Sequence, residues 1–161
     1  IFFNLALTET DDSHTPVSIA KLYVAGGELS EGNSLFLEKQ NTHKDSYIAT
    51  FGVSASDFFS ELELYLDEKF SDYDVLLRLN CEGVEDDVIY SVHNSFGNKL
   101  KLICGALKDV EELKGLDASQ KLDKFISDNQ LLFVKFNSGI YSWPKAHAAV
   151  LNLLGKKDKS S

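Results

Sequence analysis

The sequence has few of the residues with which proteins hold nucleic acid. Of its 161 residues, 16 are Lys or Arg and 25 are Asp or Glu, which gives a formal net charge of −9. Arg78 is the only arginine. Lys and Arg on phosphates supply most of the affinity for nucleic acid, and Arg also supplies bidentate contacts. This balance therefore argues against tight binding of DNA or RNA.

Cysteine, methionine and long apolar runs are also scarce. Cys81 and Cys104 lie on apolar segments without a Cys-x-x-Cys spacing. They predict buried free thiols in a reducing, intracellular and cytoplasmic compartment, with one disulfide as the alternative. No apolar run reaches the ~20 residues that a membrane-spanning helix needs, so we expect no membrane partner. Because the chain begins at Ile1 and contains no methionine, we expect an excised domain or a processed product.

What is present is typical of one folded domain. Hydrophobic residues make up 43% of the chain and charged residues 25%, a composition of globular rather than disordered proteins. A chain of 161 residues is long enough to bury most of its apolar surface in one core. We expect residues 1–155 to form one domain and residues 156–161, which are Lys, Asp and Ser, to form a polar tail.

The apolar and turn patterns predict an α/β fold. Strands are expected at residues 1–8, 17–25 and 28–39, with a hairpin turn at Gly26-Gly27. Ser54 and Asp57 form a capping pattern for a helix that ends near Phe70. Further elements are expected as a strand at 74–80, a helix at 86–94, a strand or helix at 100–107, a helix at 118–127, a strand at 131–136 and a helix at 142–154. This order predicts a mixed sheet of about five strands, the first three antiparallel, flanked by helices.

Several short patterns follow one another in an order that a known family shares. Phe3-Asn4-Leu5-Ala6-Leu7-Thr8 is similar to a first strand written Phe-Asp-Leu-Glu-Thr-Thr. Residues 50–57, Thr-Phe-Gly-Val-Ser-Ala-Ser-Asp, resemble a loop written Ile-His-Gly-Ile-Thr-x-x-Asp. Residues 74–81, Asp-Val-Leu-Leu-Arg-Leu-Asn-Cys, resemble Asp-Val-Leu-Val-Ala-His-Asn-Ala. Together they resemble the 3′–5′ exonuclease domains of the DEDDh class, which implies a ribonuclease-H-like fold.

The resemblance also implies that the catalytic site is degenerate. In that family four carboxylates hold two divalent ions, and a histidine removes a proton from the attacking water. Here Asn4 and Ala6 replace two of the carboxylates, and Phe51 replaces a histidine. Glu85 falls where the family has a third acid. Magnesium needs charged oxygens, which an amide or a methyl group cannot replace.

The last motif of the family, His-x-Ala-x-x-Asp, fits in two registers. One register keeps His147 and places Asn152 where the acid belongs, and the other aligns Ser142 with the histidine and His147 with the acid. In both registers at most one of the four metal carboxylates survives. The resemblance therefore implies no catalytic residue, no bound metal and no other cofactor.

Three functions of different classes follow from these patterns. The favoured one is a catalytically inactive exonuclease-like domain that serves as an interaction or scaffold module for another protein or a covalently linked domain. The second is a nucleic-acid-binding module that does not cut, with these candidate contacts: Lys99, Lys101, Lys135, Trp143 and Lys145. The third is a nuclease that holds Mg²⁺ or Mn²⁺ on relocated ligands, for which Asp11, Glu85 and Asp86 are the candidates. The alternative interpretation of Asp11 is a solvated turn, and that of Glu85-Asp86-Asp87 is helix capping; both argue against the third function.

Overall fold

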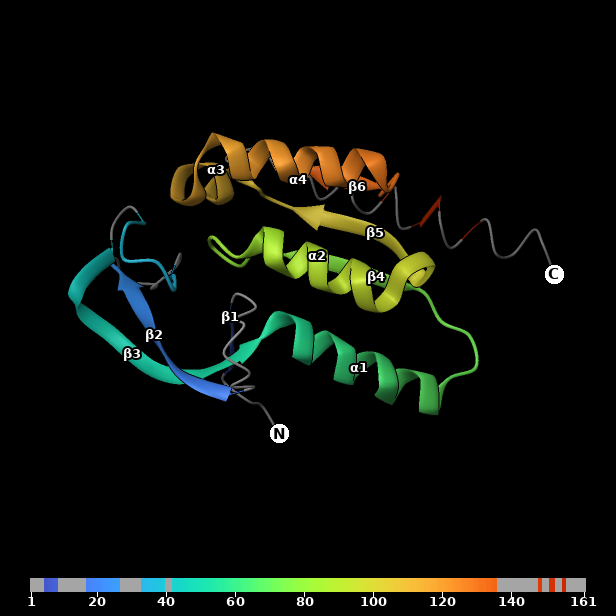
Figure 1. Cartoon of the computed structure of the whole chain (residues 1–161), viewed down its shortest axis with the longest axis horizontal. Coiled ribbons are helices and arrows are strands. Elements are labelled where there is room, and N and C mark those ends of the chain that lie inside the picture. The colour runs from blue at the N-terminus through green and yellow to red at the C-terminus, as the bar shows by residue number, and fades with distance from the viewer. Residues whose placement is uncertain are drawn as a thin grey trace.

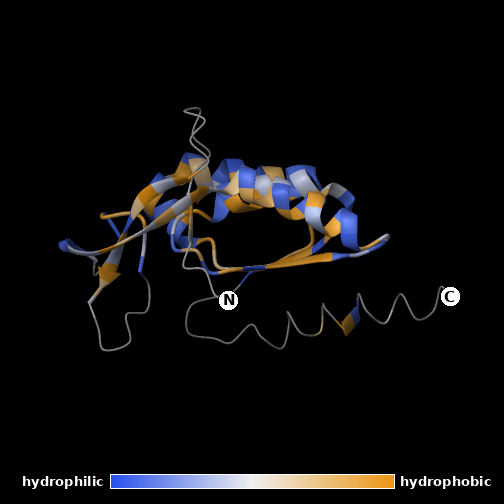
Figure 2. Ribbon diagram, turned by 90° about the horizontal axis from the view of Figure 1, so that it is seen from below, coloured by the Kyte–Doolittle hydropathy of each residue, from blue (hydrophilic) through white to orange (hydrophobic). Residues whose placement is uncertain are grey.

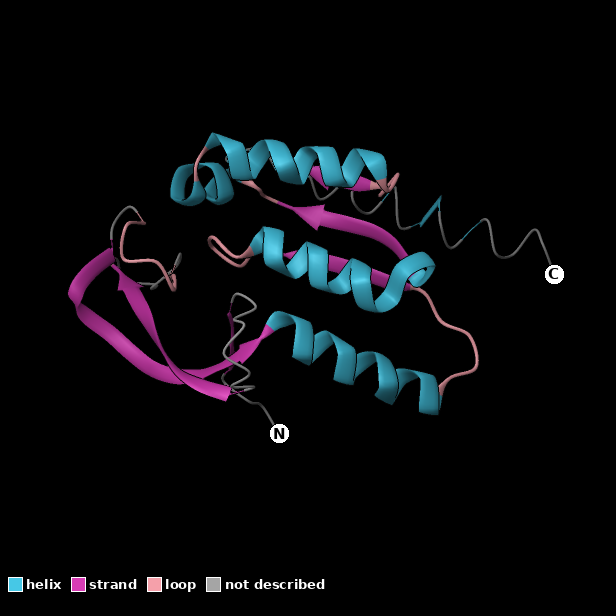
Figure 3. Ribbon diagram, viewed as in Figure 1, coloured by secondary structure: helices cyan, strands magenta, loops and turns pink. Residues whose placement is uncertain are grey.

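The computed structural model describes residues 5–8, 17–26, 33–39, 42–135, 148, 151–152 and 155. Within them the chain forms a mixed α/β structure with two small sheets, as Figures 1 and 3 show. The elements are, in chain order, β1 (Leu5–Thr8), β2 (Val17–Ala25), β3 (Thr42–Ser54), α1 (Ala55–Lys69), β4 (Val75–Leu79), α2 (Glu85–Phe96), the 3₁₀ turn η1 (Gly97–Lys99), β5 (Leu100–Gly105), α3 (Lys108–Lys114), α4 (Leu116–Asp128) and β6 (Phe133–Lys135). The α/β class predicted from the sequence is confirmed.

The first sheet has the strand order β1-β3-β2. β2 runs antiparallel to β3, and the pairing places Ile19 opposite Phe51 and Tyr23 opposite Tyr47. β1 runs parallel to the last residues of β3, with Leu7 opposite Val53. The prediction that the first three strands are antiparallel is therefore wrong for β1.

Helix α1 continues directly from β3, as Figure 1 shows. Ser54 is its N-cap, and the Ser54 Oγ accepts the backbone N–H of Asp57 at 3.5 Å. The helix ends at Lys69, and Phe70 is its C-cap. The cap satisfies a free amide of the first turn. The predicted start of this helix at Ser54 and its predicted end near Phe70 are both confirmed.

The second sheet is parallel, with the order β4-β5-β6. Parallel strands need long crossovers, which α2 supplies between β4 and β5 and the α3–α4 pair supplies between β5 and β6. The helices lie in one layer above these strands in Figure 2.

Leu79 lies opposite Gly105, and a Cβ added at Gly105 would come within 2.7 Å of the Leu79 Cβ. The close approach of β4 and β5 therefore needs a glycine here.

The core lies between the helices and the second sheet. It is built from apolar side chains of α1, α2, β4, β5, α3 and α4, together with the loops that join them. Its most buried members, each at most 1% exposed, are Ala55, Leu79, Val88, Ile89, Val92, Ile103, Val110 and Leu122. The apolar stripe predicted for residues 118–127 faces this core, since Leu122 is buried and Phe125 and Ile126 pack against it. The predicted elements at 17–25, 74–80, 86–94 and 118–127 are confirmed, residues 133–135 of the strand predicted at 131–136 form β6, and residues 100–105 form a strand.

Other predictions are corrected by the structure. The described residues form two three-stranded sheets rather than one mixed sheet of about five strands. The third strand is β3, not residues 28–39, of which the described part, 33–39, makes only an isolated bridge from Ser34 to Tyr23. β3 was not predicted because most of its side chains are exposed, so its sequence lacks the apolar alternation by which a strand is recognised. Helix α3 was also missed, and the predicted helix at 142–154 lies mostly outside the described residues.

Both cysteines, Cys81 and Cys104, are free thiols, as predicted. Each side chain is half-buried, and this burial raises the pKa of both thiols above the usual value. Among the described residues, no helix is both long and apolar enough to cross a lipid bilayer.

Candidate functional site

Only some of the residues named by the resemblance to exonucleases lie within the described structure. Ala6 is half-buried on β1, opposite Gly52 of β3, and Phe51 is 57% exposed on β3. Glu85 is the first residue of α2 and follows β4, which belongs to the other sheet. Asn152 is exposed. The other named positions, Asn4, Asp11, Ser142, Trp143, Lys145 and His147, lie outside the described residues.

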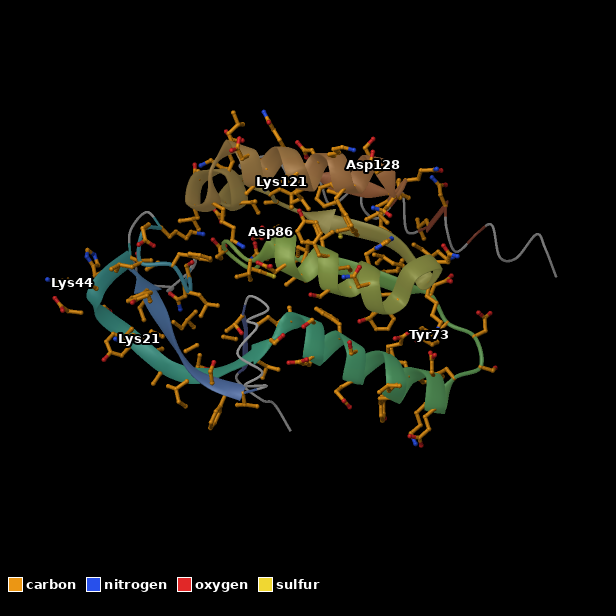
Figure 4. The ribbon with its side chains drawn as sticks, in the orientation of Figure 1. Lys21, Lys44, Tyr73, Asp86, Lys121 and Asp128 are labelled. Carbon is orange, nitrogen blue, oxygen red and sulfur yellow. The ribbon has the colours of Figure 1, made fainter. Side chains whose placement is uncertain are left out.

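The described structure does gather charged side chains beyond the carboxyl ends of β4 and β5. We call this group the charge cluster; its members are Lys39, Glu82, Glu85, Asp86, Asp87, Asp109 and Lys114. In open parallel sheets, ligands bind at this edge of the strands. The charge cluster is therefore the part of the described structure to test first for a functional site. Figure 4 labels one of its members, Asp86, at the start of α2.

Glu85 is directed inward and bonded to backbone. Its side chain is among the most buried charged groups, at 2% exposure. Its two carboxylate oxygens accept the backbone N–H of Gly83 at 2.8 Å and that of Cys81 at 3.2 Å. Burial raises the pKa of Glu85, with a smaller contribution from the negative charge of Asp109, while the backbone N–H bonds oppose the rise. Glu85 thus holds the loop between β4 and α2 in place.

Lys114 neutralises the next two acids. Its Nζ lies 2.7 Å from Asp86 Oδ1 and 2.6 Å from Asp87 Oδ2. All three side chains are largely buried, with exposures of 15% for Lys114, 11% for Asp86 and 24% for Asp87. The two acids also lie in the first turn of α2, where the helix dipole favours negative charge. Lys114 ends α3, so the cluster joins α3 to the start of α2.

Lys39 joins a third segment to the same cluster. Its Nζ pairs with Glu82 and lies 2.8 Å from Asp109 Oδ2. Near it, the Ser34 Oγ donates to the backbone carbonyl of Glu82 at 2.7 Å, and Ser34 is 1% exposed. The segment 33–39 is therefore bound to the loop after β4 by one buried hydroxyl and one shared ammonium group.

The carboxylates of the charge cluster are all engaged by other groups of the chain. Each carboxylate of the charge cluster already accepts a hydrogen bond or an ion pair from a lysine or a backbone amide. Within the described residues, no group of three or more His, Cys, Asp or Glu side chains is arranged to hold a metal. Glu85 and Asp86, two of the predicted relocated ligands, are close in sequence, but their side chains bind different partners. The acidic run lies in the first turn of α2, where the helix dipole favours negative charge, but the N-cap is Val84 and no side chain caps the helix by a hydrogen bond.

In the loop between β4 and α2, Gly83 is the residue at which we expect substitution to be tolerated least. Its φ of +122° lies in a region that residues with a Cβ rarely adopt, and an added Cβ would lie 2.6 Å from Leu113 Cδ1 and 2.8 Å from Phe36 Cδ2. Replacing Gly83 with alanine is expected to lower the free energy of unfolding by about 1 to 2 kcal/mol, measured by urea denaturation. Gly97→Ala is the control, since Gly97 also has a positive φ but nothing within 4 Å of its Cβ position. A smaller loss for Gly83→Ala than for Gly97→Ala would contradict this packing.

The lysines predicted to form a nucleic-acid-binding stripe lie apart. Lys99 pairs with Asp67 and donates to the Tyr73 hydroxyl, and Lys101 donates to the backbone carbonyl of Asn98. These two lysines stand at the amino end of the second sheet. Lys135 ends β6 and pairs in register with Gly105, at the carboxyl end of the same sheet. The described candidates therefore do not form one continuous basic stripe.

Sequence reasoning missed the two lysines of the charge cluster. Lys39 was assigned to a strand, and Lys114 stood in a segment for which no element was predicted. The one signal that could have indicated Lys114 is the acidic run of residues 85–87, because three buried or capping acids need a cation nearby. No local pattern identifies which lysine supplies it.

Comparisons with protein-family models, curated proteins and solved structures found no match for this chain.

Proposed function

We propose that this chain is a catalytically inactive exonuclease-like domain that works as a protein-interaction or scaffold module. The observation that carries the proposal is that Glu85 is buried and bonded to backbone amides. It stands where the resembling family has a metal-binding acid, yet its carboxylate is buried and bonded to the N–H groups of Cys81 and Gly83. A buried carboxylate that accepts two amides of its own loop has fewer acceptor sites left for a divalent ion.

The likeness to an exonuclease domain is part of this proposal, although the described strands form two three-stranded sheets and not one five-stranded ribonuclease-H-like sheet. It is supported by the order of β1, β2, β3, α1, β4, α2 and β5 along the chain. It is also supported by the position of Glu85 at the start of the helix after β4. The methyl group of Ala6 and the phenyl ring of Phe51 supply neither a ligand nor a base. The net charge of −9 favours a protein partner over nucleic acid.

The test is metal binding measured together with nuclease activity. In calorimetric titration with MnCl₂, the chain is expected to show no binding of paired ions. In an assay with a 3′-labelled oligonucleotide and Mn²⁺, product is expected at the rate of the blank. Manganese-dependent cleavage that disappears in a Glu85→Gln variant with an unchanged circular dichroism spectrum would reject the proposal and establish the nuclease with relocated ligands.

A further inference from the structure

The β2–β3 pair exposes a row of apolar side chains on one face. Val17, Ile19, Tyr47 and Phe51 are 55%, 70%, 47% and 57% exposed. The antiparallel register pairs Ile19 with Phe51 and Val17 with Val53, so the odd-numbered side chains of both strands share this face. Ile19 and Phe51 are direct cross-strand neighbours with Val17 two residues away, and the Lys21–Ala49 pair separates them from Tyr47. Neighbouring exposed apolar groups of this size are typical of a contact surface rather than of scattered surface residues.

The outer edge of β2 also presents backbone groups. The N–H of Tyr23 donates to Ser34 O at 2.8 Å and its carbonyl accepts the Ser34 N–H at 3.1 Å, so the backbone groups of Tyr23 point away from β3. The register with β3 is unbroken from Val17 to Tyr23. Because a strand repeats every two residues, the backbone groups of Val17, Ile19 and Lys21 point to the same edge. Among the described residues, no backbone hydrogen bond is made by these outward-pointing groups.

We propose that this edge pairs with the β2 strand of a second copy of the chain. In an antiparallel pair, residues whose backbone groups face the partner strand must lie opposite one another, so odd positions pair with odd positions. The register that pairs all three outward residues and leaves the Tyr23–Ser34 bridge intact sets Ile19 against Ile19 of the copy and Val17 against Lys21 of the copy. It forms about six backbone hydrogen bonds, two for each pair. Equivalent strands then meet across a two-fold axis, which is the commonest symmetry of protein dimers.

The charges of this surface favour a second copy over other occupants. The charged residues of the described ribbon, apart from His43, are Lys21, Lys44 and Asp45, so the ribbon is nearly neutral in a chain of net charge −9. Lys21 and Lys44 are labelled on it in Figure 4. By strand alternation this face carries one charge of each sign, Lys21 and Asp45, so it has no net charge that would repel a second copy. Lys21 lies over the Tyr47 ring at 4.6 Å, and in the proposed register the two Lys21 residues stand about 13 Å apart along the strands. This exceeds the Debye length of about 8 Å at physiological salt, so their repulsion is screened.

An oligonucleotide or an acidic peptide fits this face less well. Phosphate contacts come chiefly from Lys and Arg, and the described ribbon offers only Lys21 and Lys44. An acidic strand would find a single lysine, Lys21, on β2. In the proposed register, each outward residue of β2 instead lies opposite an apolar side chain or the methylene groups of a lysine of the second copy.

This inference rests on the proposed function, since it names a partner for an interaction module, but the two can fail separately. Nuclease activity would reject the proposed function and leave the association unchanged, whereas a monomer would reject this inference and create no nuclease. Sedimentation velocity of the 161-residue chain over a wide concentration range is the experiment. We expect the mean mass to rise from one chain toward two as the concentration increases.

The variants test the register. Ile19→Lys places two like charges opposite each other, so it is expected to remain monomeric at every concentration. Ile48→Lys is the control, because Ile48 is 54% exposed on the other face of the ribbon and its substitution should leave association unchanged. An equimolar mixture of Ile19→Lys and Ile19→Glu is expected to form the dimer again. Circular dichroism and melting curves check that each variant is folded.

A parent chain that stays monomeric throughout would overturn the proposal. So would an Ile19→Lys variant that associates like the parent, or a mixture of the Lys and Glu variants that fails to pair. If the parent is monomeric and NMR signals of β2 shift on addition of oligothymidylate, the face binds nucleic acid instead.

Discussion

Replacing Glu85 with leucine is expected to lower the free energy of unfolding by about 3 kcal/mol. Leucine has a similar volume but no acceptor, so the N–H groups of Gly83 and Cys81 would lose their partner in a buried loop. Each buried donor left without an acceptor costs roughly 1 to 3 kcal/mol. Urea denaturation followed by circular dichroism measures the change.

The Glu85→Gln variant separates the effect of the charge from that of the hydrogen bonds. Burial raises the pKa of Glu85 in the folded state, so the folded chain binds this proton more tightly than the unfolded chain does. Its contribution to stability is therefore fully present below the ordinary glutamate pKa of about 4.3, and it is lost as the pH rises through the higher folded-state value. Glutamine does not titrate. We expect the stability of the parent relative to Glu85→Gln to increase as the pH is lowered from about 7 to about 4.

Glu61→Leu is the matched control for the leucine variant. Glu61 is exposed on α1, and its loss is expected to change stability by less than about 0.5 kcal/mol. If Glu85→Leu is no more damaging than Glu61→Leu, the loop amides have other acceptors. Glu85 would then be available as a metal ligand, and the proposed loss of catalysis would lose its main support.

The second large effect is expected from Lys114→Met. Methionine keeps most of the apolar stem but removes the ammonium group that lies between Asp86 and Asp87. Breaking a buried ion pair costs roughly 3 to 5 kcal/mol because a buried charge is left without compensation. These side chains keep 11% to 24% exposure, so we expect a smaller loss of about 2 to 3 kcal/mol, measured by urea denaturation.

A second variant and a control from the same helix test this explanation. Changing Asp86 and Asp87 to asparagine in the Lys114→Met background removes the uncompensated charges and should restore a substantial part of the lost stability. Lys108→Met breaks the exposed pair of Lys108 with Glu112, which should cost at most about 1 kcal/mol. Equal losses for Lys108→Met and Lys114→Met would contradict a buried cluster.

Much of the secondary structure could be predicted from the sequence, because the signals that specify it are local. The cap formed by Ser54 with the Asp57 amide determines where α1 begins, and an apolar run between polar residues marks β4. β3 could not be predicted in this way. Its side chains from His43 to Ala49 are exposed, so its strand conformation comes from hydrogen bonds to β2 and not from burial of one face.

The candidate site was predictable only in part. The acidic run of residues 85–87 was recognised, and helix capping was weighed there against metal binding. The direction of the Glu85 side chain was not predictable, because it depends on two amides in a turn where Glu82 and Gly83 both have positive φ. The cations could not be predicted either, since Lys39 and Lys114 reach the cluster from distant parts of the chain.

The sequence by itself determined the α/β class and most helix and strand positions. Those properties depend on neighbouring residues and on residue identity alone. Within the described residues, the tertiary structure decided how the strands divide into two sheets and which lysine neutralises which acid. These properties depend on contacts between residues far apart in sequence. Which segments meet depends on the path of the loops and helices that connect them, and which side chains pair depends on the need to neutralise buried charges.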